Sequence, residues 1–124
     1  MGEAIRISVG GVTVAAELND SPTAQDIFAA LPIKGSGSRW GDEIYFSIPV
    51  EQSLASDARD EMVVGELAFW PPGNAFCIFF GPTPASLAGE PRAASPANPV
   101  GRVTDGVSVL LSSKSGESVT IEKA

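Results

Sequence analysis

Apolar and polar residues alternate near both ends of the chain, and this alternation predicts β-strands. Every second residue is apolar through 5–9 and again through 12–18, on either side of Gly10-Gly11. A period of two on both sides of a two-glycine turn predicts an antiparallel hairpin with one buried face. The same alternation over Ser118–Glu122 predicts another strand near the C-terminus.

The segment "NDSPTAQDIFAALP" changes to a helical spacing. Ser21 can cap a helix that has Pro22 in its first turn, and Thr23 with Asp26 forms a second possible capping pair. Pro32 ends the pattern. The apolar side of this short helix consists of Ile27, Phe28 and Leu31. Such a short helix is stable only when it docks on a sheet.

The middle of the chain predicts one clear strand between two loops. "IKGSGSRW" is typical of a flexible glycine- and serine-rich loop. Near Ile44 a strand begins, with Ile44, Phe46 and Ile48 on one face and Tyr45 and Ser47 on the other. The polar stretch 52–61 then predicts a loop that leads into a strand over 62–64.

The stretch "ELAFWPPGNAFCIFF" predicts two strands, 67–70 and 75–80, joined by a Pro-Pro-Gly-Asn corner. Both faces of the second strand are apolar, which indicates a central strand covered on both sides. Cys77 is expected in this core. Trp70 stands directly before the corner, where an amphipathic ring often lies at the rim of a groove.

The last third of the chain is rich in proline and alanine. Residues 81–98 predict a long loop, which in a compact domain is usually functional or mobile. A short strand is expected over 99–103, followed by a short helix capped by Asp105 with Val107, Leu110 and Leu111 inward. The pattern therefore predicts one mainly β domain over residues 1–124, with six to eight strands, one or two short helices, and a barrel or sandwich architecture.

Charge and composition exclude several classes of function. The net charge is −7, from 15 acidic and 8 basic residues without a basic cluster, so nucleic acid is not an expected partner. The chain has no histidine and one cysteine, which excludes Ser-His-Asp and Cys-His catalysis, histidine metal sites and multi-cysteine zinc sites. No cofactor or metal is expected.

No segment predicts membrane insertion or export. The longest apolar run, "AFCIFF", is far too short to span a bilayer, and "MGEAIRISVGGVTV" lacks the continuous apolar core of a signal peptide. The expected location is therefore cytoplasmic, with no membrane partner.

Four landmarks, in order over nearly the whole chain, resemble the cyclophilin family. They are "VTVAAELNDSPTAQDIFAAL", "GELAFW", "NAFCIFF" and "PVGRVTDGVSVL". More narrowly, "WGDEIYFSIPV", "FWPPGNAFCIFFGPTP" and "NPVGRV" resemble small prokaryotic cyclophilin-like proteins. This resemblance implies a closed β-barrel of about eight strands, capped by one or two short helices.

The resemblance also implies a partial match to the site of a peptidyl-prolyl cis-trans isomerase. Arg39 falls at the catalytic arginine and Ser47 at a site glutamine, while Ile44 falls at the phenylalanine of the proline pocket. On the aromatic strand, Phe76 matches the first phenylalanine, but Cys77 replaces the second, and Ala75 replaces a glutamine. The pocket histidine and tryptophan have no counterpart in "ASLAGEPRAASPAN".

Two functions follow as expectations. The first is a binding module for a small molecule or a proline-containing peptide, in which the isomerase pocket is largely lost. The alternative is a prolyl isomerase rebuilt around Arg39, whose guanidinium would stabilise the twisted X–Pro bond. A purely structural or oligomer-forming role is a third possibility. The candidate ligand-binding residues are Trp40, Tyr45, Ser47, Trp70 and Phe79.

One pair of acidic residues is not expected to be catalytic. Asp42 and Glu43 are adjacent on the predicted strand, so their side chains point to opposite faces. Their spacing therefore does not predict a paired-carboxylate acid–base site.

Overall fold

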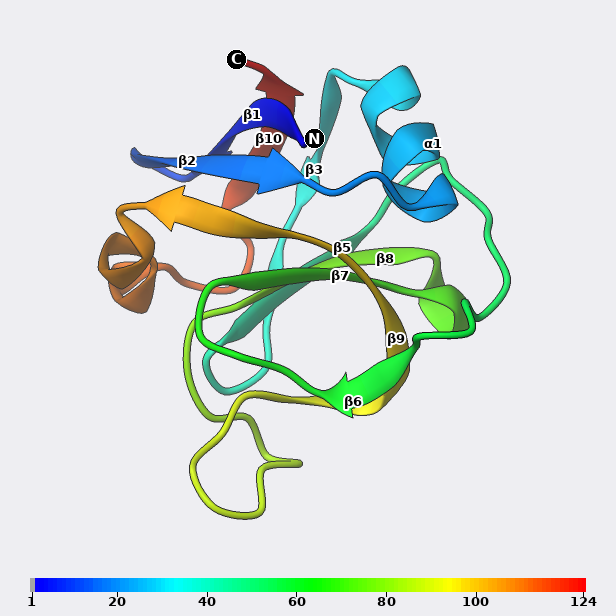
Figure 1. Ribbon diagram of the computed structural model, residues 1–124. Coiled ribbons are helices and arrows are strands. Elements are labelled where there is room, and N and C mark those ends of the chain that lie inside the picture. The colour runs from blue at the N-terminus through cyan, green and yellow to red at the C-terminus, as the bar shows by residue number, and fades with distance from the viewer. Residues whose placement is uncertain (1) are drawn as a thin grey trace.

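The computed structural model describes residues 2–124, and its dominant feature is a curved antiparallel sheet of ten strands (Figure 1). The strand order is β3-β10-β1-β2-β9-β7-β8-β5-β4, and β6 pairs with β9 beside this path. The mainly β prediction is confirmed. The strands are β1 (Glu3–Val9), β2 (Val12–Leu18), β3 (Ile33–Ser36), β4 (Ser38–Arg39), β5 (Glu43–Ser47), β6 (Arg59–Glu61), β7 (Glu66–Trp70), β8 (Ala75–Phe79), β9 (Arg92–Asp105) and β10 (Ser118–Lys123).

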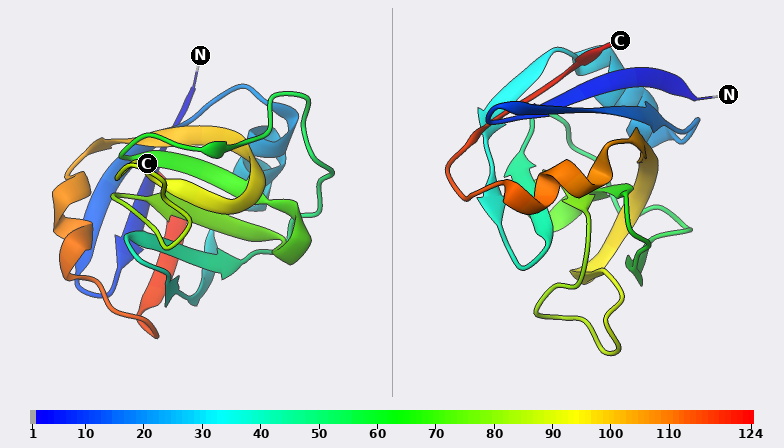
Figure 2. Two further views of the ribbon diagram at one scale, coloured as in Figure 1. Left: turned by 90° about the horizontal axis from the view of Figure 1, so that it is seen from below. Right: turned by 90° about the vertical axis from the view of Figure 1, so that its left-hand side faces the viewer.

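The sheet bends over on itself, so that β1, β2 and β10 lie across from β5, β7 and β8 (Figures 1 and 2). The main core fills the space between these two halves. Burial of such apolar surface is the dominant favourable term in folding. Its largest fully buried members include Ile5, Ile7, Leu18, Ile27, Leu67, Phe69, Phe76, Ile78, Leu110 and Ile121.

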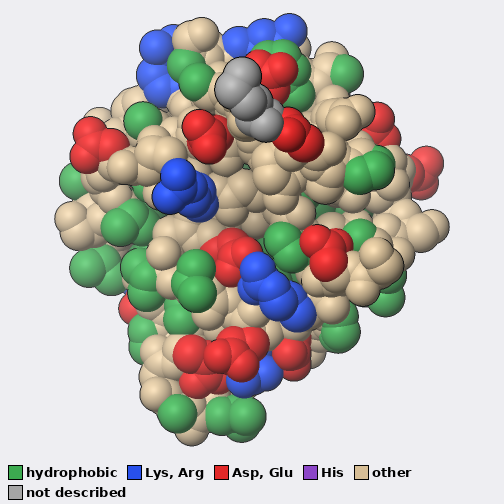
Figure 3. Space-filling model, in the orientation of Figure 1, with side chains coloured by type: hydrophobic (Ala, Val, Ile, Leu, Met, Phe, Trp, Pro, Cys, Tyr) green, Lys and Arg blue, Asp and Glu red, His purple; other side chains and the backbone are tan. Residues whose placement is uncertain are grey.

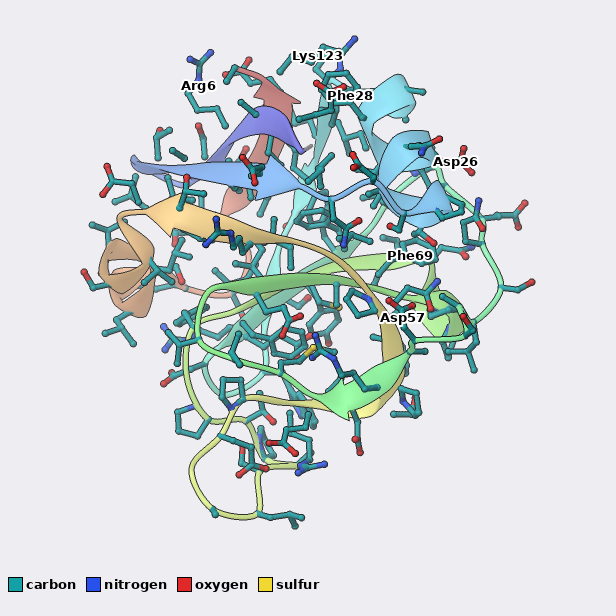
Figure 4. The ribbon with its side chains drawn as sticks, in the orientation of Figure 1. Arg6, Asp26, Phe28, Asp57, Phe69 and Lys123 are labelled. Atoms are coloured by element: carbon teal, nitrogen blue, oxygen red, sulfur yellow. The ribbon has the colours of Figure 1, made fainter. Side chains whose placement is uncertain are left out.

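The N-terminal hairpin and the helix form as the sequence predicts. β1 and β2 pair through Ser8–Thr13 and Val9–Val12, with Gly10 in the left-handed region at φ +58°. Helix α1 (Pro22–Ala30) is preceded by Ser21, whose hydroxyl accepts the Ala24 N–H, so Ser21 and not Thr23 is the cap. The helix docks at one end of the sheet, where the Lys123 ammonium lies 4.7 Å from the Phe28 ring centroid (Figure 4).

The β7–β8 hairpin is buried on both faces, as predicted for a central strand. Its corner is a short 3-10 helix, η1 (Pro71–Gly73), followed by Asn74 in the left-handed region at φ +47°. One face packs into the main core. The outer face carries the buried side chains of Ala68, Ala75, Cys77 and Phe79, which pack with Met62, Ala93 and Ala97 in a second, smaller core.

Two segments differ from the loops or strands expected for them. Residues 33–39 form β3 and β4 instead of a flexible loop, because β10 and β5 supply hydrogen-bonding partners for their backbone. The strand expected over 62–64 lies earlier, at β6, where Arg59 and Glu61 pair with β9. Met62 is buried after it, whereas Val63 and Val64 are exposed.

Much of the proline-rich stretch is also strand. β9 runs through Pro96 and Pro99, although proline cannot donate to a ladder. The strand tolerates Pro99 because the pairing of β9 with β7 is irregular between Leu67 and Ala68. The Pro99 carbonyl accepts a hydrogen bond from the Asn19 side-chain amide at 3.1 Å.

The expected helix after residue 105 is a 3-10 helix, η2 (Val107–Ser112), with Gly106 as its N-cap. Asp105 is therefore the end of β9 and not the helix cap. Leu110 points inward as expected, but Leu111 is exposed.

The segment between β8 and β9 is a loop organised by Glu90. Its carboxylate accepts the N–H groups of Leu87 and Ala88 and the Arg92 guanidinium, and these bonds lower its pKa to about 2. Arg92 also pairs with Asp60 and Glu61 of β6. Acidic and basic side chains accordingly lie together in the lower part of Figure 3. This ion-pair cluster fastens the loop to β6.

Across residues 2–124, no helix has the length and apolar character needed to cross a membrane.

Gly101 provides a test of the packing between β2 and β9. A Cβ there would overlap the Glu17 carbonyl oxygen and lie 3.0 Å from the Leu18 Cα, both of them backbone atoms. We therefore expect Gly101→Ala to lower the free energy of unfolding by about 2 kcal/mol or more. Urea denaturation measures this loss.

The control is Gly11→Ala, where a Cβ would meet nothing within 4 Å. If Gly101→Ala proved no more destabilising than this control, the conclusion that β2 and β9 lie too close at Gly101 to admit a side chain would be wrong.

Candidate functional site

A cavity of about 260 Å³ opens on the outer face of the sheet, next to the second core. Strands β5 and β8 provide one side of it, the end of β7 provides another, and the start of β9 crosses opposite. Its walls are mostly aromatic and aliphatic, with one ionisable carboxyl group. The lining residues are Trp40, Glu43, Tyr45, Trp70, Cys77, Ala93 and Ala94.

The tight turn between β4 and β5 positions Trp40 and Glu43. The backbones of these two residues exchange hydrogen bonds of 2.9 and 3.2 Å around Gly41, which has φ +61°. The Asp42 N–H donates to the Pro82 carbonyl, and the Phe80 N–H donates to the Asp42 carbonyl. A Cβ on Gly41 would lie 2.8 Å from the Thr83 Cα, so glycine lets the turn sit directly against residues 82–84.

Trp70 forms a fixed wall of the cavity. Its indole N–H donates to the Ser95 hydroxyl at 2.8 Å, which joins β7 to β9. Gly73 lies against the other part of the ring, since a Cβ there would be 3.2 Å from two ring carbons. The half-buried ring is thus held by a hydrogen bond and by the corner that follows it, as an amphipathic rim residue requires.

Glu43 and Cys77 place polar atoms inside this apolar cavity. Glu43 is 5% exposed, and burial raises the pKa of its carboxyl group to about 7, although a hydrogen bond with Cys77 acts in the opposite direction. Burial, followed by the nearby Glu43 charge, raises the pKa of the Cys77 thiol well above its usual value. The thiol therefore stays protonated, and it donates to the Ala75 carbonyl at 3.9 Å, so it is not a reactive nucleophile.

Three of the six predicted site residues meet at the cavity: Trp40, Tyr45 and Trp70. Tyr45 is 37% exposed and lies at the open side. The other three do not line it. Phe79 is fully buried in the second core, and the exposed Ser47 donates its hydroxyl to the Gly73 carbonyl at 3.0 Å.

Arg39 is tied into the protein away from the cavity lining. Four of its hydrogen bonds go to the carbonyls of Gly41, Leu111 and Ser113 and to the Asp42 carboxylate, at 2.6–3.0 Å. The guanidinium also lies 5.1 Å from the centre of the Phe80 ring. Through these contacts the Arg39 side chain joins the β4–β5 turn to the end of η2, which is a structural role.

The other positions matched to the isomerase site divide between the two faces of the sheet. Ile44 and Phe76 are buried in the main core, on the face away from the cavity. Cys77 lines the cavity, and Ala75 is buried in the second core. Of the positions carried over by resemblance, Cys77 alone is among the residues that line the cavity.

Glu43 is the functional candidate that the sequence reasoning missed. The sequence predicts no acid–base pair at Asp42 and Glu43, because the strand period separates their side chains. The useful signal is that Glu43 shares a strand face with Tyr45, and the register of β5 against β8 brings that face beside Cys77 and Phe79. A carboxyl group on a face adjoining a fully apolar strand is expected to be buried.

Comparisons with known proteins agree with this fold. The family model described as Cyclophilin-like matches residues 3–122. The solution structure of a hypothetical protein from Archaeoglobus fulgidus is similar to this chain, with 37% sequence identity and a TM-score of 0.83. The match covers 99% of this chain and 95% of that one. The sequence finds no match among the curated proteins.

We expect Arg39→Lys to lower the free energy of unfolding by about 1–3 kcal/mol. A lysine ammonium cannot satisfy the separate acceptors that the planar guanidinium reaches, and it leaves part-buried carbonyls unpaired. Urea denaturation is the measurement. In the control Arg6→Lys, an exposed pair with Glu122 at 3.5 Å is altered, and the loss should stay below about 0.5 kcal/mol. Equal losses in the two variants would contradict the structural role of Arg39.

Glu43 should make stability depend on pH. The folded protein holds this proton up to about pH 7, whereas an unfolded chain releases it near its ordinary pKa of 4.5. The stabilising contribution is thus fully present below pH 4.5 and is lost as the pH rises through 7. Since glutamine does not ionise, Glu43→Gln should gain up to about 3 kcal/mol relative to the native protein between pH 4.5 and 8.

Urea denaturation of both proteins at several pH values measures this relative gain. Glu3→Gln removes a carboxyl group at an exposed position of β1 and is the control. A Glu43→Gln difference that did not change with pH, or changed as it does in the control, would show that the Glu43 carboxyl is not buried in a cavity.

Proposed function

The chain belongs to the cyclophilin-like family, and from that premise we propose that it is a binding module for a small ligand. The observation that carries the proposal is the cavity of about 260 Å³ walled by Trp40, Tyr45 and Trp70. Ligand sites in proteins are typically concave and mostly apolar, with few polar groups inside. The volume is small, which favours a small molecule, or one ring or side chain of a peptide, over an extended segment.

Contacts within the protein hold one wall of the cavity and the turn that carries another. Trp70 is held by Ser95 and Gly73, and the turn that carries Trp40 is hydrogen-bonded to residues 80–82. A site that is already ordered loses little conformational entropy when it binds. This preorganisation supports a binding role for the cavity.

We include the closed barrel in this proposal. The end strands of the sheet, β3 and β4, are consecutive segments joined by Gly37. Gly37 donates to the Glu117 carbonyl and accepts the Gly116 N–H at 2.9 and 2.8 Å. Residues 33–39 thereby connect β10 to β5, and this continuity supports closure.

The alternative, prolyl isomerisation at Arg39, has weaker support. Catalysis would need free N–H donors directed at the twisted prolyl amide. Four donor contacts of Arg39 are already made to Gly41, Asp42, Leu111 and Ser113. Exchange NMR on an Ala-Pro peptide tests this alternative, and an acceleration abolished by Arg39→Ala would favour it over the proposed function.

The proposed function is tested by filling the cavity. Ala94 lines the cavity but is exposed, so Ala94→Leu adds apolar bulk there without disturbing buried packing. We expect amide NMR shifts from a set of neutral, cationic and anionic fragments to map onto residues 40–45, 70 and 93–95. In the Ala94→Leu variant, the affinity for these fragments should fall by about tenfold or more, because the leucine side chain fills the space that they would occupy.

Ala15→Leu makes the same change at an exposed position on β2 and is the control. It should bind the fragments as the native protein does. If fragments of every charge left residues 40–45, 70 and 93–95 unshifted, or if Ala94→Leu bound them unchanged, the cavity would not be a ligand site.

A further inference from the structure

Two carboxyl groups are buried on the outer face of the sheet, and they differ in whether a cationic side chain is paired with them. Glu66 on β7 is paired with Arg59, whose guanidinium contacts both carboxylate oxygens, and it also accepts the Val63 N–H at 3.0 Å. In the described part of the chain, no cationic side chain pairs with Glu43 on β5, and the neutral Cys77 thiol is the polar side chain beside it in the cavity. The protein thus supplies a cation for one buried carboxyl group and leaves the other facing the cavity.

An unpaired carboxyl group in an apolar site is costly. Removing a carboxylate from water without a counter-ion is unfavourable, and buried charges in proteins are normally paired. A weak neutral donor such as a thiol offsets only part of this cost, and the raised pKa of Glu43 is consistent with an incomplete set of partners. A cation that entered the cavity would give the Glu43 carboxylate the charged partner that Arg59 gives to Glu66.

The aromatic walls suit the same ligand. Trp40, Tyr45 and Trp70 surround the cavity, and the faces of such rings attract cations, most strongly for tryptophan. Alkyl groups beside a positive charge would pack against the same rings and against Ala93. The net charge of −7 adds a field that attracts cations and repels anions.

A metal ion is a poorer fit than an organic cation. In the described part of the chain, no group of three or more metal-ligating side chains comes together. The cavity offers one carboxylate and one thiol that stays protonated, whereas bound metal ions in proteins take several oxygen, nitrogen or thiolate ligands.

We propose that this cavity binds a small organic cation, an alkylammonium group with an apolar body, with Glu43 as its counter-ion and the three aromatic side chains as its walls. This inference rests on the proposed function, because it names the ligand class of the same cavity. Glu43 determines specificity here: it selects charge, while the volume of the cavity selects size.

The test compares two probes of similar shape and different charge, cyclohexylammonium and cyclohexanol. Binding is followed by amide NMR titration at pH 8, above the pKa of Glu43, and at about 0.15 M salt, where attraction by distant surface charges is largely screened. We expect cyclohexylammonium to bind at least about tenfold more tightly, as a charge-assisted contact and ring faces together allow. The shifts should map onto residues 40–45, 70 and 93–94.

Two variants assign the preference to the cavity. Glu43→Gln keeps the size of the side chain and should abolish the difference between the probes while cyclohexanol still binds. Glu3→Gln removes one acidic group at an exposed position of β1 and should keep the difference. Because both variants are read through a ratio of two probes, a general change in stability does not produce the expected result.

Three outcomes would overturn the proposal. Equal affinity for the two probes would leave the cavity a ligand site without charge selection, so the proposed function would survive and this inference would not. Retention of the preference in Glu43→Gln would place the cation elsewhere. Binding of neither probe would exclude alkylammonium ligands, and the neutral and anionic fragments in the cavity-filling test then decide independently whether the cavity binds any ligand.

Discussion

The structure depends on the burial of both faces of the β7–β8 hairpin. All five residues of β8 are buried, and Phe76 and Ile78 serve the main core while Cys77 and Phe79 face the opposite way. A sheet face with this much apolar surface cannot remain in water at acceptable cost. The first half of β9, together with Met62, must therefore cross over it. The cavity is the space that this cover leaves open beside the turn that carries Trp40.

The covering segment is fixed by a buried polar network centred on Asn98. The Asn98 amide donates to the Thr23 hydroxyl and the Ser53 carbonyl at 3.1 and 2.9 Å, and its oxygen accepts the Ala55 N–H at 2.8 Å. A fully satisfied buried network specifies one arrangement, because every alternative leaves polar groups unpaired. Helix α1, the polar segment after β5 and the middle of β9 are thereby held together. Arg39 does a comparable task at the other end of the sheet, with its bonds to the carbonyls of residues 41, 111 and 113.

Local patterns in the sequence predict the elements that carry their own signal. The Gly10-Gly11 hairpin, the helix after Ser21 and the β7–β8 hairpin all follow from period and turn chemistry. β3, β4 and the first half of β9 do not, because glycine, serine and proline make poor strands unless neighbouring strands supply partners. The same distinction applies to the cavity. Trp40, Tyr45 and Trp70 could be proposed as rim residues from their positions, whereas Glu43 and Ala93 become visible only once β5 is paired with β8 and covered by β9.

The two-sided burial of β8 also divides the lining of the cavity into residues that belong to the second core and residues that do not. Cys77 and Ala93 belong at once to the cavity and to the second core, so a new side chain there would disturb the folding of the whole domain. Tyr45 and Ala94 line the same cavity from exposed positions and take no part in that core. Substitutions at Tyr45 and Ala94 would therefore change the shape of the cavity while leaving the second core and the buried Glu43 as they are.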